Sequence, residues 1–304
     1  MTSYSEQIGV LAALAAGIIW GFLGVFVREL DAMGVTPMQM TCLRYIVVAI
    51  CLVAYILIKD RSLFRTDLKC FGVFLIMGVV GTILNSVCYF SAMSMISLSL
   101  AAVLQYLAPF VVILLSLPLF HEKLTKTKVM AVIVAFLGCV LCTGVLTAEG
   151  PLDLWGIFLG AFSGFCFAVY TLGSKVVAKE KSPLPTILVY TSLICIVGLA
   201  PICDLPSAIE MTVNNTDILL LIIGTGIFVT LLPFVLFNYS LGKIEAGKAS
   251  IITYAEPLAA TVVGYLYYEE VIGLDGAVGI ILILIALIAI NRKGNTEKDE
   301  DGPA

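Results

Sequence analysis

The stretch Tyr106-Leu107-Ala108-Pro109 returns 148 residues further along the 304-residue chain as Tyr254-Ala255-Glu256-Pro257. Glu122 and Glu270 follow the two prolines at the same distance. Spaced small residues nearer the start of each half also match, at an offset of 147: Gly9, Ala13, Gly17 and Gly21 fall on Gly156, Gly160, Gly164 and Ala168. A match that persists at one offset indicates an internal duplication.

The composition places both halves in a lipid environment. Hydrophobic residues make up 61% of the chain, charged residues only 12%, and the mean hydropathy is +1.09. A soluble chain needs more polar side chains to cover its surface. Apolar stretches of about 20 residues, the length that spans a bilayer, predict ten helices: 8–28, 37–58, 70–91, 99–120, 127–146, 153–174, 185–203, 217–238, 248–267 and 273–291.

These helices form two groups of five. Because five is odd, the second group must cross the membrane in the opposite sense to the first. We therefore predict an all-α polytopic membrane protein with ten transmembrane helices in two inverted five-helix repeats. The first repeat covers residues 1–146, the second covers 153–291, and a cytoplasmic disordered tail covers 292–304.

The basic residues are distributed very unevenly between the two sides of this predicted bundle. Of the 17 Lys and Arg residues, all but Arg28 and Arg44 fall on the side that carries both chain ends. Lys and Arg in short loops mark the cytoplasmic side of a membrane protein. We expect both termini to be cytoplasmic.

The sequence resembles the EamA-type transporters of the drug/metabolite transporter superfamily. A Gly-x-x-Trp-Gly motif at Gly17, Trp20 and Gly21 with Arg28 behind it, the triplet Leu43-Arg44-Tyr45, and the duplicated proline-to-glutamate element carry the resemblance. It implies a ten-helix fold with a central cavity between the halves, used for export or exchange of amino acids and related metabolites. We expect a secondary transporter in a bacterial cytoplasmic membrane that exports small polar metabolites by alternating access.

Two charged residues at membrane depth are the clearest candidates for a substrate path. Arg44 and Glu256 are costly to bury in lipid, and such residues are functional by default. Arg44 could instead reach the interface or pair with Glu29 or Asp31. Glu256 could bind a proton or an ammonium group, which leaves proton coupling possible, or it could serve only as a hydrogen-bonding partner.

Polar and aromatic side chains around the two prolines complete the predicted path. Each proline removes a backbone donor inside the membrane, so Pro109 and Pro257 are candidate hinges that line the cavity, with inert kinks as the alternative. The other candidates can line the path or simply join and pack helices; they are Trp20, Asn85, Tyr89, Gln105, Tyr106, Tyr170, Asn238 and Tyr254.

No pattern for a cofactor, a metal or catalysis is found. The segment Gly242–Ala249 resembles a phosphate-binding loop but has Ala249 where Ser or Thr is required, and His121 is the only histidine. Most of the nine cysteines lie in apolar runs, which argues against a disulfide framework. We expect a small-molecule substrate and the lipid bilayer as partners, no nucleic acid and no enzymatic activity, with a homodimer possible. The alternative function is a membrane receptor that senses a small ligand without translocating it.

Overall fold

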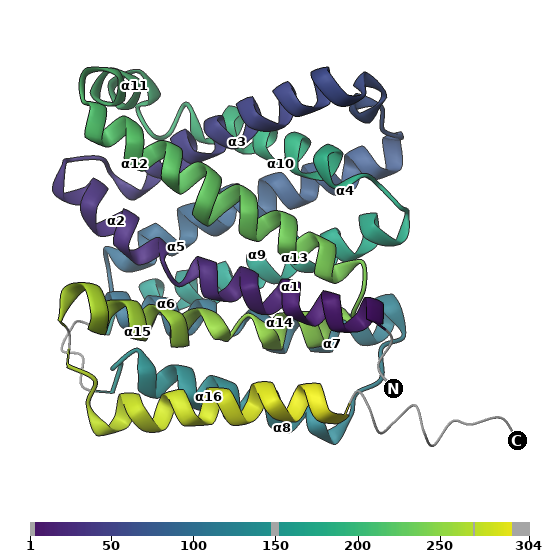
Figure 1. Cartoon of the computed structure of the whole chain (residues 1–304). Helices are drawn as coiled ribbons and strands as arrows, with labels where there is room; N and C mark the ends of the chain where they lie inside the picture. Colours follow the sequence, from purple (N-terminus) through teal and green to yellow (C-terminus); the bar gives the residue numbers. More distant parts are fainter. Residues whose placement is uncertain (1–3, 147–151, 270, 294–304) are drawn as a thin grey trace, which may run out of the picture.

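The computed structural model describes residues 4–146, 152–269 and 271–293, with the side chains of 292 and 293 left aside. These residues form helices and connecting turns, and they contain no strand (Figure 1). The predicted all-α class therefore holds for the described chain. The predicted disordered tail lies outside the described residues from position 294 onward.

The helices of the first half are α1 (Tyr4–Trp20), α2 (Leu23–Ala32), α3 (Pro37–Lys59), α4 (Leu68–Gly78), α5 (Asn85–Met93), α6 (Leu98–Gln105), α7 (Ala108–Phe120) and α8 (Lys126–Cys142). Those of the second half are α9 (Leu154–Lys179), α10 (Leu184–Leu199), α11 (Leu205–Asn214), α12 (Thr216–Gly226), α13 (Leu232–Leu241), α14 (Ala246–Ile252), α15 (Ala255–Tyr268) and α16 (Leu274–Lys293). A short 3-10 helix spans Arg61–Phe64.

The duplication is visible in the irregular parts of the helices. A π-helical turn, Val79–Leu84, joins α4 to α5, and a second, Ile227–Leu231, joins α12 to α13. In each turn a threonine hydroxyl donates to the carbonyl oxygen five residues earlier, at 3.2 Å for Thr82 and 2.9 Å for Thr230. Insertions of this kind are frequent at functional sites, and these two occupy matching positions in the two halves.

Eight helical segments of the described chain are long and apolar enough to cross a membrane. They are Tyr4–Ala32, Pro37–Lys59, Leu68–Met93, Leu98–Phe120, Leu154–Lys179, Thr216–Leu241, Ala246–Tyr268 and Leu274–Asn291. The other two predicted spans are shorter: Lys126–Cys142 has 17 residues and Leu184–Leu199 has 16. The ten-span count therefore stays a prediction.

Two helices end earlier than the hydropathy predicts, and one helix was not predicted. The span predicted over 127–146 ends at Cys142, and the span predicted over 185–203 ends at Leu199, shortly before Pro201. Pro201 has no N–H to donate to the preceding turn, so the helix does not continue through it. The segment Leu205–Asn214, treated as a simple connection, forms the short helix α11, which buries Ala208 and Thr212.

The two halves are interlocked, because the first helix of each half packs against the other half. Figure 1 shows α1 beside α13, α14 and α15. A methyl group on Gly21, just after α1, would lie 2.6 Å from the Cβ atom of Ala259 in α15. Correspondingly, a methyl group on Gly164 of α9 would lie 2.9 Å from the carbonyl oxygen of Gln105 in α6. The spaced small residues of both halves thus permit close helix contact.

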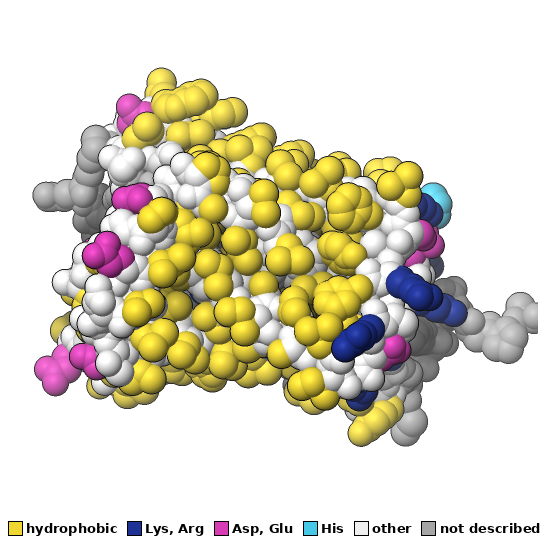
Figure 2. Space-filling view, turned by 90° about the horizontal axis from the view of Figure 1, so that it is seen from above, with side chains coloured by type: hydrophobic (Ala, Val, Ile, Leu, Met, Phe, Trp, Pro, Cys, Tyr) yellow, Lys and Arg dark blue, Asp and Glu magenta, His cyan; other side chains and the backbone are white. Residues whose placement is uncertain are grey.

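The surface of the protein is that of an integral membrane protein. Figure 2 shows a broad apolar area between two ends that carry the charged side chains, with Lys and Arg gathered at one of them. The loops 60–67, 121–125, 180–183 and 242–245 meet there, and we call it the basic end. Lys69 Nζ lies 2.6 Å from Glu180 Oε1 at this end. The loops 33–36 and 94–97 and the helix α11 lie at the other end, which we call the opposite end.

Candidate functional site

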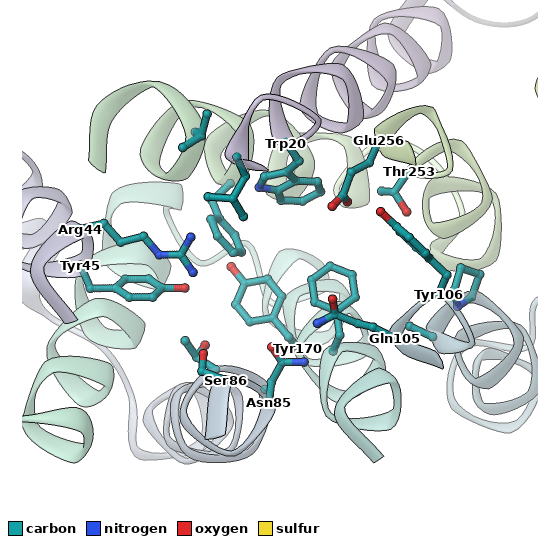
Figure 3. A pocket seen from close by; sticks show the side chains of 18 residues that line it. Trp20, Arg44, Tyr45, Asn85, Ser86, Gln105, Tyr106, Tyr170, Thr253 and Glu256 are labelled. Carbon is teal, nitrogen blue, oxygen red and sulfur yellow. The ribbon is translucent and has the colours of Figure 1, made fainter. Parts of the chain in front are cut away.

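A central cavity lies between the two halves and consists of two joined hollows. The inner hollow has a volume of about 120 Å³ and is drawn in Figure 3. The outer hollow has a volume of about 280 Å³ and continues toward the opposite end, where Met93 and Leu98 line it. The residues that line both are Trp20, Leu23, Arg44, Asn85, Ser86, Gln105 and Glu256. This shared lining makes the two hollows one path.

Arg44 and Glu256 stand on different walls of the inner hollow (Figure 3). Arg44 lies about two turns into α3. That helix begins at Pro37, where the Thr36 hydroxyl accepts a 3.3 Å hydrogen bond from the Gln39 amide. The guanidinium carbon of Arg44 lies 5.6 Å from the ring centre of Tyr45, and its Nε atom is buried without a hydrogen-bond partner among the described residues. Within the described part of the chain, no ion pair joins Arg44 to Glu29 or Asp31.

Glu256 comes from the second half, in the first turn of α15. Tyr106, from the first half, lines the same hollow. Figure 3 shows both side chains directed toward the same side of the hollow. The cavity thus offers a cation donated by one half and an acceptor group donated by the other. Such a pair can bind oppositely charged groups of one small molecule.

Aromatic rings form the wall between these charges. The ring of Trp20 meets those of Phe234 and Phe237 at centroid distances of 5.4 Å, each edge to face. Tyr170 packs against Phe234 at 5.2 Å. Edge-to-face rings hold one another in place, so this wall is a fixed, mainly apolar surface beside the two charged groups.

Most of the predicted path residues line the cavity, but Asn238 and Tyr254 lie behind the wall. The Nδ2 atom of Asn238 donates to the Tyr170 hydroxyl at 3.0 Å and to the Phe234 carbonyl oxygen at 2.8 Å. The Tyr254 side chain is fully buried, and its hydroxyl group donates to the Tyr106 carbonyl oxygen at 2.7 Å. Both residues therefore support cavity residues.

Asn85 has a role in joining the halves as well as in lining the cavity. Its Nδ2 atom donates to the Ser163 carbonyl oxygen of α9 at 2.8 Å. Tyr89 and Gln105 line the outer hollow. Lining residues that the sequence reasoning missed are Tyr45, Thr82, Ser86, Phe167, Phe234 and Thr253. Tyr45 could have been found from the Leu43-Arg44-Tyr45 triplet, whereas the phenylalanines carry no signal in a chain that is apolar throughout.

Both candidate hinge prolines follow a break in the helix. The helical segment 98–120 is interrupted at Tyr106 and Leu107, just before Pro109 in the first turn of α7. The segment 246–268 is interrupted at Thr253 and Tyr254, just before Pro257. A proline has no N–H for the turn before it, so a break at this position is expected. Pro109 lines the inner hollow. Pro257 is buried and directly follows Glu256 in the sequence.

This architecture, with two matching helical halves around a polar cavity in an apolar shell, defines a membrane transporter. The EamA-like transporter family model matches the chain twice, over residues 7–144 and 154–292. The protein belongs to the EamA-like transporter family, which confirms the resemblance found in the sequence. The two matched regions correspond to the two halves.

Similar proteins in bacteria and archaea bear transporter names. An "Uncharacterized transporter" of Archaeoglobus fulgidus is 29% identical over 289 residues, which cover 94% of this chain and 97% of that protein. The "Uncharacterized transporter YxxF" of Bacillus subtilis is 25% identical, with 99% and 96% covered. A solved crystal structure at 18% identity gives a TM-score of 0.75 over 92% of this chain and 95% of its own, and shows the same fold.

Proposed function

We propose that this protein is a secondary transporter that exports small polar metabolites, amino acids or related compounds, by alternating access. The observation that carries the proposal is the cavity between the halves, with Arg44 and Glu256 on different walls. The uneven distribution of Lys and Arg supports cytoplasmic termini and a basic end that faces the cytoplasm. A bacterial cytoplasmic membrane is the proposed location.

The charges and the aromatic wall favour a zwitterion as the substrate. Its carboxylate would bind the guanidinium of Arg44, whose buried Nε atom has no partner among the described groups. Its ammonium group would bind Glu256, which lines the same hollow as Tyr106. A short side chain would lie against the rings of Trp20 and Tyr170. Charge-assisted hydrogen bonds of this kind are stronger than neutral ones.

We propose that the breaks before Pro109 and Pro257 are the hinges of the transport cycle. They occur at matching positions in the two halves, and both adjoin the cavity. Bending at the two breaks would move α7 relative to α6, and α15 relative to α14. The polar groups that line the cavity would keep their places. Proton coupling through Glu256 is part of this proposal, since a carboxylate at the centre of the path can exchange a proton for an ammonium group.

A thermal-shift panel on the purified protein tests the proposal, because a ligand that binds only the folded state raises its melting temperature. The panel pairs each amino acid with its decarboxylated amine and its deaminated acid. We expect a shift for at least one zwitterion that both partners fail to produce. Shifts with no requirement for both charges would contradict the binding mode, and a shift without transmembrane flux would favour a receptor.

A further inference from the structure

The turn 242–245 at the basic end connects α13 to α14, and it is held by charged side chains from α9 and from the loop 121–125. At the end of α13, Lys175 Nζ donates to the carbonyl oxygens of Leu241 at 2.7 Å and Ile244 at 2.5 Å. The last carbonyl groups of a helix have no partner within it and carry partial negative charge. Lys175, from α9 of the same half, therefore stabilises the turn at the C-terminal end of α13.

A negatively charged side chain, that of Glu122, contacts the chain on the other side of the turn. The carboxylate of Glu122 accepts from the Ala246 amide at 2.7 Å and from the Gly247 amide at 3.1 Å. These two amides begin α14, and residue 245 before them provides no side-chain cap. Glu122 belongs to the first half and is 9% exposed. One buried carboxylate of the first half thus satisfies the amides at the start of a helix in the second.

The matching helix start in the first half is that of α6. The α6 helix begins at Leu98, and its own Ser97 hydroxyl accepts from the Leu100 amide at 3.2 Å. This start is capped by its neighbour in sequence and lies at the opposite end, toward which the outer hollow extends past Met93 and Leu98. The start of α14 is thus joined across the halves by Glu122, and the start of α6 is capped by Ser97.

Two further ion pairs cross between the halves beside Glu122. Lys128 Nζ of α8 lies 2.7 Å from Glu245 Oε2, and Lys248 Nζ lies 3.3 Å from Glu6 Oε1 of α1. The lysine side chains are 8% and 7% exposed, so these contacts are screened by solvent less than surface pairs. A left-handed residue, His121 with φ 56°, ends α7 and turns the chain toward Glu122.

We propose that Glu122 is the latch of a gate at the basic end. With the latch closed, the start of α14 is held against the first half and the cavity communicates with the opposite end only. Opening the basic end requires the carboxylate to leave the Ala246 and Gly247 amides. The inference rests on the proposed transport function, but it concerns a contact that lies outside the central cavity.

The direct test is the accessibility of the inner hollow from the basic end. Thr253 lines that hollow and directly follows the last residue of α14. Thr253→Cys is made alone and with Glu122→Gln, and membrane vesicles of both orientations are treated with a membrane-impermeant thiol reagent. The protein without the Thr253→Cys change gives the background from the nine native cysteines. We expect Glu122→Gln to speed labelling from the basic end about tenfold, the ratio that corresponds to ~1.4 kcal/mol, as for a lost hydrogen bond to a charged group.

Glu180→Gln is the matched control, because Glu180 also crosses between the halves at the basic end but pairs with Lys69 in an exposed position. It should leave the labelling rate unchanged. An unchanged rate in Glu122→Gln, or an equal increase in Glu180→Gln, would overturn the proposal.

Lys128→Gln provides a second test in case the Glu122→Gln variant does not fold. It removes the pair with Glu245 and the hydrogen bond to the Lys123 carbonyl oxygen, and we expect a smaller increase in labelling from the basic end. If Glu122→Gln fails to fold, no increase in Lys128→Gln would overturn the latch. Substrate flux is measured separately, so that a protein without transport can still show the latch, and a transporter without the latch can still show flux.

Discussion

The hydroxyl group of Tyr254 donates a 2.7 Å hydrogen bond to the main-chain carbonyl oxygen of Tyr106, the residue that matches it in the other half. The two rings lie 5.9 Å apart at their centroids. Each tyrosine sits at the break of its own helical segment, so the bond joins the two breaks directly. Tyr106 and Thr253, the residue before Tyr254, both line the inner hollow.

Tyr254→Phe removes this bond and keeps the ring. The Tyr106 carbonyl oxygen would lose a partner in a buried position, and the expected cost is about 1–3 kcal/mol. A lower melting temperature of the purified protein would show it. Tyr89→Phe, at a tyrosine that lines the outer hollow, is the comparison and should change the melting temperature less. Equal melting temperatures for the wild type and Tyr254→Phe would contradict the assigned role.

Arg44→Lys tests whether the guanidinium binds the carboxylate of the substrate. Lysine keeps the positive charge but lacks the planar pair of donors. We expect at least about a tenfold loss of affinity, which corresponds to ~1.4 kcal/mol for a weakened charged hydrogen bond. The measurement is the ligand concentration that gives half of the maximal thermal shift. Wild-type affinity of Arg44→Lys for carboxylate substrates would contradict binding of the substrate carboxylate by the paired donors of Arg44.

Glu256→Gln removes the carboxylate on the other wall and keeps its size. We expect the variant to fold, to lose affinity for substrates with an ammonium group, and to lose the dependence of flux on pH if Glu256 carries a coupled proton. Flux is compared across pH in proteoliposomes made with wild type and variant. Unchanged pH dependence would assign Glu256 to a structural role.

Gly21→Ala tests the interlocking of the halves. The new methyl group would meet the Ala259 Cβ atom at 2.6 Å and the amide nitrogen of Ala260 at 2.8 Å, so α1 would have to move away from α15. We expect a lower melting temperature and lower flux. Gly72→Ala is the control, because its methyl group would find nothing within 4 Å and alanine favours a helix by up to about 1 kcal/mol. A lower melting temperature for Gly72→Ala together with a wild-type melting temperature for Gly21→Ala would contradict the prediction.

The duplication could be predicted from the sequence because its signals are local and repeated. Tyr106, Pro109 and their counterparts mark the two breaks, and spaced glycines mark the helices that pack most closely. The role of Glu122 could not be predicted, because its partners lie 124 and 125 positions away in the chain and bind through main-chain amides, which every residue possesses. Helix lengths were overestimated where apolar turns follow Cys142 and Leu199.

The candidate site was predictable only where polarity singled out a residue. Arg44, Asn85, Gln105 and Glu256 stand out in apolar helices, and all four line the cavity. Asn238 stood out equally, yet it faces Tyr170 from behind the wall. The orientation of a side chain around its helix depends on packing between helices, and an apolar shell on every side leaves no periodic pattern to reveal it.

The central claim is that the cavity carries a zwitterion from one side of the membrane to the other. Counterflow in proteoliposomes tests it most directly: vesicles loaded with an excess of the unlabelled ligand found in the thermal-shift panel are diluted into trace labelled ligand. The account predicts transient accumulation of label for wild type and Glu180→Gln, less for Glu256→Gln and none for Arg44→Gln, each in folded form. Binding without accumulation in wild type, or full accumulation in both cavity variants, would contradict it.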